Sequence, residues 1–237
     1  MTPAPAPLWF RADVGHARLG FTDARTDLGR GPAADGSAVA GVQSLGAALG
    51  GRPALMRQVH GAQVAVADPD APTPQADALI VDRPGIVAIV RVADCTPVVV
   101  VAPDRPLAAV VHAGRVGMAA GIVTATVDQL RRRGAEQLEA WVGPRACGRC
   151  YEVPAQMADD VAALEPAARA TTRRGTPGLD IGAGVIAQLQ RAGVTVHDLG
   201  GCTIEDDTFW SHRRQGDAAG RFGAGVVLGE AGDHAAP

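Results

Sequence analysis

The sequence predicts a single α+β domain in which mixed β-sheets are covered by helices. Short apolar runs, bounded by turn residues and rich in β-branched side chains, occur in clusters along the 237 residues. Helical patterns separate these clusters but do not alternate strictly with single strands, which disfavours a doubly wound fold. Hydrophobic residues make up 47% of the chain, enough for a sizeable core.

The centre of the predicted fold is the segment 85–114. It holds three apolar runs that we expect to be buried strands, Ile86–Val92, Val98–Ala102 and Leu107–Val111. Other strands are expected at the following positions: a strand pair within Leu8–Phe21 that turns near Gly15, then Leu55–Val59, Gln63–Val66, Leu79–Val81, Leu138–Val142, Val194–Leu199 and Arg221–Leu228.

Four segments have the pattern of a helix. Gly117–Arg133 is the clearest, since its apolar residues recur at helical spacing and its basic residues lie in the last turn. The others are Ala38–Leu49, Pro154 to about Leu164, and Leu179–Ala192. Gly201–Gln215 is expected to be a polar loop. Residues 1–7 and 229–237 are expected to be tails, which places the domain at residues 8–228.

Composition excludes several classes of protein. No apolar run approaches the roughly 20 residues of a membrane span, and no signal peptide is apparent, so we expect a cytoplasmic protein. The net charge of −3, with scattered basic residues, argues against nucleic acid as a partner. The chain contains no lysine, which excludes lysine Schiff-base chemistry and a Walker A motif.

Three side chains stand at the ends of predicted apolar segments. Cys95 lies between the first two central strands, His112 follows the third, and His60 precedes a glycine. Two imidazoles and one thiolate suit a catalytic zinc, which takes three protein ligands and leaves one position open. The same residues would also suit a Cys–His nucleophilic pair, and their spacing does not decide between the two.

A second group of cysteines lies in the loop 143–153. Cys147 and Cys150 form a C-x-x-C, but no helix starts at the motif, as a redox pair would require. A structural zinc would need a second ligand pair, and we identify none with matching spacing. We therefore expect two loop thiols.

Five motifs occur in a fixed order along the chain. They are Gln58-Val59-His60-Gly61, Ala93-Asp94-Cys95-Thr96-Pro97-Val98, His112-Ala113-Gly114, Gly143-Pro144 with Cys150-Tyr151-Glu152-Val153, and Cys202-Thr203 with Ser211-His212-Arg213-Arg214. In these motifs the chain resembles the laccase-domain family, also called YfiH-like. Its members were once described as multicopper polyphenol oxidases and later as purine nucleoside phosphorylases.

The resemblance implies a four-layer α/β/β/α sandwich, similar to the catalytic domain of cytotoxic necrotizing factor. It implies that His60, Cys95 and His112 are the catalytic and metal-binding residues. It also implies phosphorolysis of adenosine, inosine, guanosine and methylthioadenosine, together with deamination of adenosine. Where the family usually continues His-Ala-Gly with Trp-Arg-Gly or Trp-Lys-Gly, this chain has Arg115-Val116-Gly117.

A phosphorylase of this kind needs phosphate as co-substrate and a small-molecule purine nucleoside as its partner. Arg57 and Arg213 are candidates for phosphate, because a guanidinium matches its geometry. Gln58 and Asp94 complete the predicted substrate-binding set. We expect zinc at the site, with copper as the alternative, and a monomer or homodimer.

Three other functions remain open. A copper oxidase would use one Cys and two His, but a multicopper centre needs more than the six histidines present. A thiol hydrolase acting on amides would use Cys95 with a histidine. A zinc-binding scaffold without turnover is the third.

Overall fold

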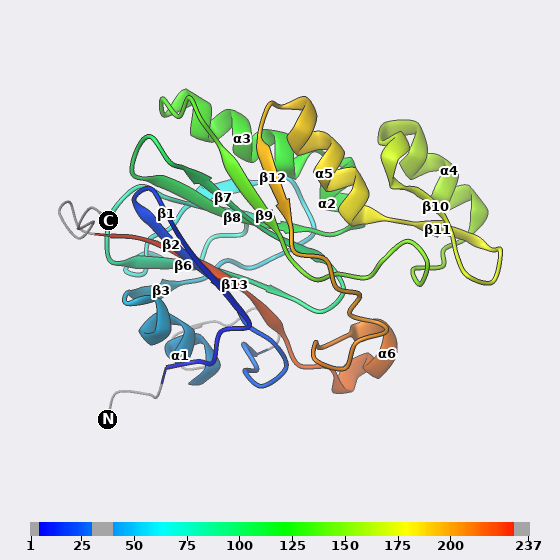
Figure 1. Cartoon of the computed structure of the whole chain (residues 1–237), viewed down its shortest axis with the longest axis horizontal. Coiled ribbons are helices and arrows are strands. Elements are labelled where there is room, and N and C mark those ends of the chain that lie inside the picture. Colours follow the sequence, from blue (N-terminus) through cyan, green and yellow to red (C-terminus); the bar gives the residue numbers. More distant parts are fainter. Residues whose placement is uncertain (1–4, 30–39, 230–237) are drawn as a thin grey trace.

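Two β-sheets lie face to face at the centre of the molecule (Figure 1). The structure is a computed structural model and describes residues 5–29 and 40–229. In spatial order the first sheet contains β1 (Phe10–Val14), β2 (Ala17–Phe21), β13 (Phe222–Leu228), β6 (Ile86–Val92) and β3 (Arg52–Ala54). The second contains β12 (Thr195–Asp198), β9 (Glu139–Val142), β7 (Thr96–Ala102), β8 (Leu107–Ala113), β5 (Ala78–Val81) and β4 (Val64–Val66).

Both sheets are mixed. Strands β3 and β6 pair in parallel, as do β4 with β5 and β12 with β9, whereas the remaining pairs are antiparallel. The central strands β6, β7, β8 and β13 are buried at every residue. Their continuous apolar sequences follow from this, because both faces of each sheet are covered.

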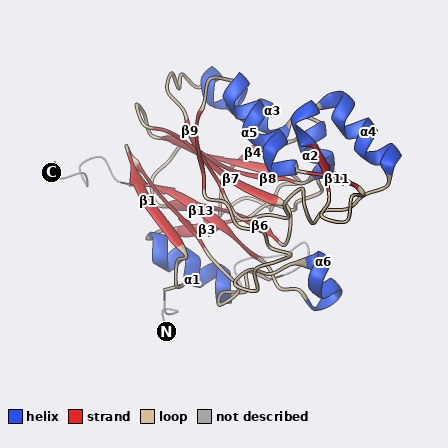
Figure 2. Ribbon diagram, turned by 45° about the vertical axis from the view of Figure 1, so that its right-hand side comes forward, coloured by secondary structure: helices blue, strands red, loops and turns tan. Residues whose placement is uncertain are grey.

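Helices cover the outer face of each sheet, and this produces four layers (Figures 1 and 2). Helix α1 (Ala40–Leu49) packs on the five-stranded sheet, while α3 (Ile122–Arg132) and α5 (Ile181–Arg191) pack on the six-stranded sheet. Alternation along β7 shows the layering. Val98 and Val100 contact the helices, and Val99 and Val101 face the other sheet. Each fully buried side chain of this kind stabilises the fold by roughly 1.5–3 kcal/mol.

The predicted α/β/β/α sandwich is therefore confirmed, and most predicted elements occur within a few residues of their expected bounds. The remaining elements are α2 (Arg115–Ala119), α4 (Ala155–Leu164), α6 (His212–Gln215), a hairpin of β10 (Arg169–Thr171) and β11 (Pro177–Leu179), and two 3₁₀ turns at Pro166–Ala168 and Gly216–Ala218.

Three predictions of local structure were wrong. The helix expected over Gly117–Arg133 is two helices, because Gly121 adopts a left-handed φ of 83° between α2 and α3. The strand expected at Leu55–Val59 lies earlier, at β3. The loop expected over Gly201–Gln215 ends in α6, which Ser211 caps by accepting a hydrogen bond from the Arg214 N–H.

The ends of the chain are only partly described. Of the predicted N-terminal tail, residues 1–4 lie outside the described residues. Ala6 is buried against α1 and donates a hydrogen bond to the Ser44 carbonyl, so the packed part of the chain begins before Leu8. Residues 230–237 of the predicted C-terminal tail, and residues 38 and 39 of the helix predicted over Ala38–Leu49, also lie outside. Within the described ranges, no helix is long and apolar enough to cross a membrane.

Candidate active site

Strand pairing brings the predicted site residues to one edge of the six-stranded sheet. In the β7–β8 ladder Pro97 lies opposite His112, so Cys95, just before β7, lies near the end of β8. On the other side of β8, Ala78 pairs with Val111, which places Asp77 beside His112. His60 reaches the same edge from the loop between β3 and β4. The structure thus brings together His60, Cys95 and His112, whose potential ligand atoms all lie within 4.8 Å of one another.

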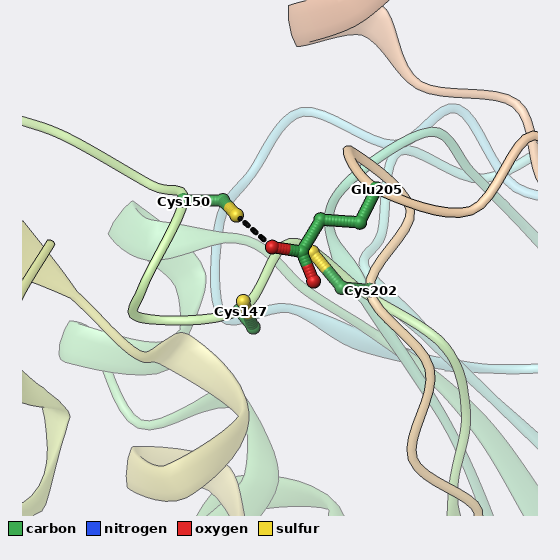
Figure 3. Close-up of side chains that lie close together, drawn as sticks. All are labelled: Cys147, Cys150, Cys202 and Glu205. Atoms are coloured by element: carbon green, nitrogen blue, oxygen red, sulfur yellow. Dashed lines mark hydrogen bonds between the residues drawn. The ribbon is translucent and has the colours of Figure 1, made fainter. Parts of the chain in front are cut away.

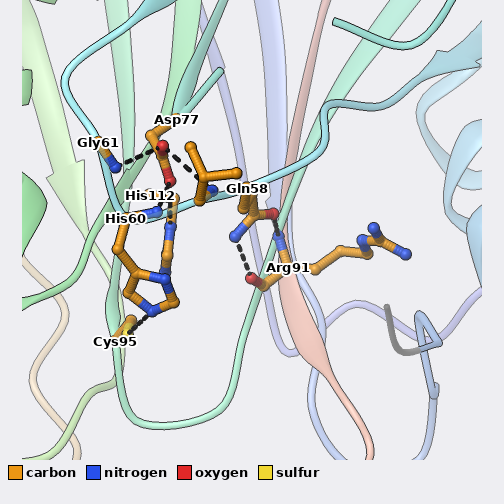
Figure 4. A network of polar contacts seen from close by, with 8 residues as sticks. Gln58, His60, Gly61, Asp77, Arg91, Cys95 and His112 are labelled. Carbon is orange, nitrogen blue, oxygen red and sulfur yellow. Dashed lines mark hydrogen bonds and ion pairs between the residues drawn. The ribbon is translucent and has the colours of Figure 1, made fainter. Parts of the chain in front are cut away.

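Asp77 organises two of these three residues (Figure 4). Its carboxylate is fully buried and lies 2.8 Å from Nδ1 of His112. It also accepts hydrogen bonds from the backbone N–H groups of Val59, His60 and Gly61, at 3.3, 2.9 and 2.7 Å. One side chain therefore fixes both the ring of His112 and the turn that carries His60.

The turn at His60 and the residue before Cys95 both have unusual backbone conformations. His60 has a φ of 60° and Asp94 a φ of 87°, in the left-handed region that L-residues rarely adopt. Such conformations persist only where the surroundings hold them, and they cluster at functional sites. The Asp77 hydrogen bonds hold the first. Asp94 is held by a hydrogen bond of 2.7 Å from the Thr203 hydroxyl and one of 2.6 Å from the Arg213 N–H.

Gly114 provides the space in which the rings and the thiol meet. A Cβ atom at this position would lie 2.7 Å from Cδ2 of His60 and 3.1 Å from Sγ of Cys95. Its φ of −80° is open to any residue, so the requirement for glycine is steric. Nε2 of His60 lies 3.8 Å from Sγ of Cys95, and the rings of His60 and His112 meet edge to face with centroids 4.6 Å apart.

The electrostatics of Cys95 and His112 are coupled. Burial alone would raise the pKa of the Cys95 thiol, but the charge of His112 and hydrogen bonds from both histidines lower it to about 6. Burial alone would lower the pKa of His112, but the Cys95 thiolate and Asp77 raise it to about 9. Both shifts favour the charged pair, a Cys95 thiolate beside a His112 imidazolium. Burial likewise opposes ionisation of Asp77, but the hydrogen bonds it accepts lower its pKa below the usual value.

These residues lie on the wall of a pocket of about 570 Å³. That volume lies within the range of small-molecule sites. Among the described residues that line it, Asp94 is the one acidic residue, whereas five are arginines, namely Arg57, Arg91, Arg115, Arg213 and Arg221. Such a surplus of arginine favours an anionic ligand.

The predicted substrate-binding residues all line this pocket. Arg57 is exposed and donates a hydrogen bond to the Gln75 side chain, and the Arg213 guanidinium lies 5.0 Å from the centroid of the Tyr151 ring. Both polar atoms of the Gln58 amide are bonded to the backbone of Arg91, at 2.8 and 3.0 Å. Figure 4 shows Gln58 between the histidines and Arg91. Arg115, which departs from the usual family motif, also lines the pocket.

The chemistry of the His60, Cys95 and His112 side chains fits a metal ion. In a tetrahedral zinc site, nitrogen and sulfur ligands lie about 3.5 Å apart, close to the 3.8 Å between His60 and Cys95. Asp77 binds Nδ1 of His112 and so leaves Nε2 as the potential ligand, an arrangement typical of histidines that bind metals.

Comparison with known proteins identifies the family of this chain. A family model described as "Multi-copper polyphenol oxidoreductase laccase" matches residues 26–229, which is most of the chain. The chain belongs to this family, the laccase-domain family. Two of its relatives are named purine nucleoside phosphorylase. That of Streptomyces coelicolor is 43% identical over 86% of this chain and 93% of its own length. The relative from Streptomyces griseus is 40% identical over 85% of this chain and 90% of its own length.

A solved structure supports the fold. The laccase-domain chain superposes on the Neisseria meningitidis protein NMB0706 with a TM-score of 0.79 and 25% identity, over 93% of this chain and 99% of that one. The family named from the sequence motifs is therefore confirmed.

Sequence analysis missed Asp77. Its signal was weak, since it is a carboxylate between two alanines just before an apolar strand, and such a residue is usually a solvated strand end. Its full burial and its distance from His112 identify it as a positioning residue.

Proposed function

We propose that this protein is a purine nucleoside phosphorylase that also deaminates adenosine at the same site. The observation that carries the proposal is the meeting of His60, Cys95 and His112 on the wall of an arginine-rich pocket. The names of the relatives support it. The proposed substrates are adenosine, inosine, guanosine and methylthioadenosine.

Phosphorolysis sets the requirements of the site. The C–N bond between the purine and the ribose breaks, an oxygen of phosphate bonds to the anomeric carbon, and the departing purine takes up a proton. The site must therefore hold a phosphate near the anomeric carbon and deliver a proton near the base.

Arg57 and Arg213 are the proposed phosphate ligands. Both are exposed, and both line the pocket. Asp94 binds the Arg213 backbone and not its guanidinium, so it positions the residue without neutralising its charge. Gln58, whose amide is bonded to Arg91, would fix the wall against which the substrate lies.

Proton transfer is assigned to the residues around Cys95. The His60 ring is exposed toward the pocket and can carry a proton to the leaving base. The His112 imidazolium, held by Asp77, stabilises the Cys95 thiolate and so sets the charge of the centre. In the zinc-bound form both imidazoles would be neutral, and an ion held by His60, Cys95 and His112 would instead polarise a bound group or lower the pKa of a bound water.

Deamination of adenosine uses water in place of phosphate. The water oxygen bonds to the purine carbon that carries the amino group, and ammonia leaves, so adenosine becomes inosine. This reaction needs a base near the water, and the Cys95–His60 pair is the proposed source.

The test is chromatography of adenosine and inosine reactions with and without phosphate. Wild-type protein is expected to release hypoxanthine from inosine only with phosphate, and to form inosine from adenosine without it. The Cys95→Ala variant is expected to lose both activities. Absence of turnover of either nucleoside by the wild type would contradict the proposal.

A histidine pair provides the matched control. His60→Ala removes an exposed ring that lines the pocket. His197→Ala removes an exposed ring on β12 that stacks on Trp141 and lies outside the pocket lining. We expect activity to be lost in the first and retained in the second. Equal loss in both variants would mean that the effect of His60→Ala is not specific to the pocket.

A further inference from the structure

Figure 3 shows a second group of side chains that could bind a metal. None of its four members lines the pocket. Cys147 and Cys150 come from the loop after β9, and Cys202 and Glu205 from the loop after β12. Their sulfur and carboxylate atoms all lie within 4.8 Å of one another. The two loops supply C-x-x-C and C-x-x-E, so the second ligand pair, which sequence analysis did not identify, contains a carboxylate.

We propose that Cys147, Cys150, Cys202 and Glu205 form a structural zinc site. Zinc binds both thiolates and carboxylates, and three thiolates with one carboxylate complete the four ligands that a structural zinc site takes from the protein. Sulfur ligands of a tetrahedral zinc lie about 3.8 Å apart, so contraction by about 1 Å or less from the 4.8 Å limit completes the site. Thiolate ligands disfavour calcium and magnesium, which prefer oxygen.

One contact within the cluster shows where a cation could replace a proton. Sγ of Cys150 donates a hydrogen bond of 2.9 Å to Glu205. Metal ligands must be deprotonated, so a bound zinc ion would release this proton and lie between the sulfur and the carboxylate. Arg173, which pairs with Glu205, would balance part of the remaining negative charge.

The site would join two loops that support the pocket. Arg145, two residues before Cys147, exchanges backbone hydrogen bonds of 3.2 and 3.1 Å with Gly201 and Thr203, on either side of Cys202. Thr203 then binds Asp94 at 2.7 Å, next to Cys95.

On the other loop, the Tyr151 N–H donates to the Cys147 carbonyl, and the Tyr151 ring lines the pocket. The zinc would thus hold one wall of the pocket in place without contacting its ligand. The inference does not depend on which reaction the pocket catalyses.

Cobalt titration of the reduced, metal-free Cys95→Ser variant tests the site. The chain has four cysteines, so in this variant any thiolate-to-cobalt charge-transfer absorption must come from Cys147, Cys150 and Cys202. We expect a tetrahedral cobalt spectrum that saturates at one equivalent and is abolished by zinc. Absence of charge-transfer absorption in this variant would overturn the proposal.

A second variant separates the cluster from the pocket. Adding Cys202→Ser to Cys95→Ser is expected to weaken cobalt binding at least tenfold and to reduce the charge-transfer intensity by about a third at saturation. In wild-type protein, Cys202→Ser alone is expected to lower bound zinc by one ion per chain. Unchanged zinc content in that variant would contradict the site.

Thermal unfolding supplies a readout that depends on neither activity nor the second variant. Zinc is expected to raise the Tm of Cys95→Ser protein by several degrees, since an ion that binds only the folded state stabilises it. An unchanged Tm at saturating zinc would overturn the proposal. So would a Cys147–Cys150 disulfide, detected by mass spectrometry, that persists when the protein is purified under reducing conditions with zinc.

Discussion

Replacing Asp77 with asparagine removes one charge from the centre of the site and leaves its volume nearly unchanged. The carboxylate accepts four hydrogen bonds, two at each oxygen: His112 and the His60 N–H at Oδ1, and the Val59 and Gly61 N–H groups at Oδ2. An asparagine NH₂ in place of either oxygen would face two donors with no acceptor.

The expected loss of stability follows from this count. A buried donor without an acceptor costs about 1–3 kcal/mol. Relaxation of the exposed turn at His60 offsets part of this, so Asp77→Asn is expected to lower the free energy of unfolding by about 2–4 kcal/mol. Loss of the partner that orients a histidine ligand typically lowers metal affinity 10–100-fold, and we expect a decrease of that size for zinc at the pocket.

The assays are urea unfolding followed by circular dichroism and competition with a zinc chelator, both in a Cys202→Ser background that removes the second proposed site. Glu165→Gln is the matched control. Glu165 is a buried carboxylate that pairs with Arg191 and does not line the pocket, so its replacement is expected to lower stability and leave zinc affinity unchanged. Unchanged zinc affinity in Asp77→Asn, or an equal decrease in Glu165→Gln, would refute the argument that Asp77 positions the ligands.

Three further predictions concern titration and packing. In metal-free protein, alkylation of Cys95 by iodoacetamide, followed by peptide mass mapping, is expected to reach half its maximal rate near pH 6. His112→Gln should move that midpoint above pH 7, because the charge that stabilises the thiolate is lost. An unchanged midpoint would contradict the pairing of Cys95 with His112. Gly114→Ala is expected to reduce turnover and zinc affinity at least tenfold, since the new Cβ would lie 2.7 Å from the His60 ring. Kinetics and zinc competition measure these two effects, and circular dichroism checks that the fold remains intact. Turnover equal to that of the wild type would show that the ring has room to move. Burial opposes ionisation of Glu165, but Arg191 lowers its pKa below the unfolded value. The ionised carboxylate therefore stabilises the fold at neutral pH, and this stabilisation is lost as pH falls through the range below about 4.3. Glu165→Gln should lower the free energy of unfolding by about 2 kcal/mol at pH 7 and by progressively less in acid unfolding titrations, and a difference that does not change with pH would refute this pairing.

The central strands were predictable because their patterns are local. Ile86–Val92 is apolar apart from Arg91 and lies between turn residues, and β6 has the predicted bounds. The break at Gly121 was not predictable from periodicity, since the apolar residues on both sides keep helical spacing and only the left-handed backbone of one glycine separates α2 from α3.

Some residues of the site could likewise be recognised from the sequence, and others could not. Cys95 and His112 were recognisable because each adjoins a strand whose burial the sequence indicates. Asp77 was not, since its role depends on the pairing of β5 with β8, which places it beside a histidine 35 residues away. Cys150 and Glu205 lie 55 residues apart and meet only because β12 pairs with β9, so the proposed second metal site could be recognised only in the tertiary structure.

The measurement that tests the central claim most directly is the rate of hypoxanthine release from inosine at saturating phosphate, compared between wild-type protein and Cys95→Ala. Phosphate-dependent release by the wild type, reduced at least a hundredfold in a variant that remains folded, is the predicted result. Phosphate-independent release, or a rate that Cys95→Ala leaves unchanged, would contradict a phosphorylase centred on Cys95.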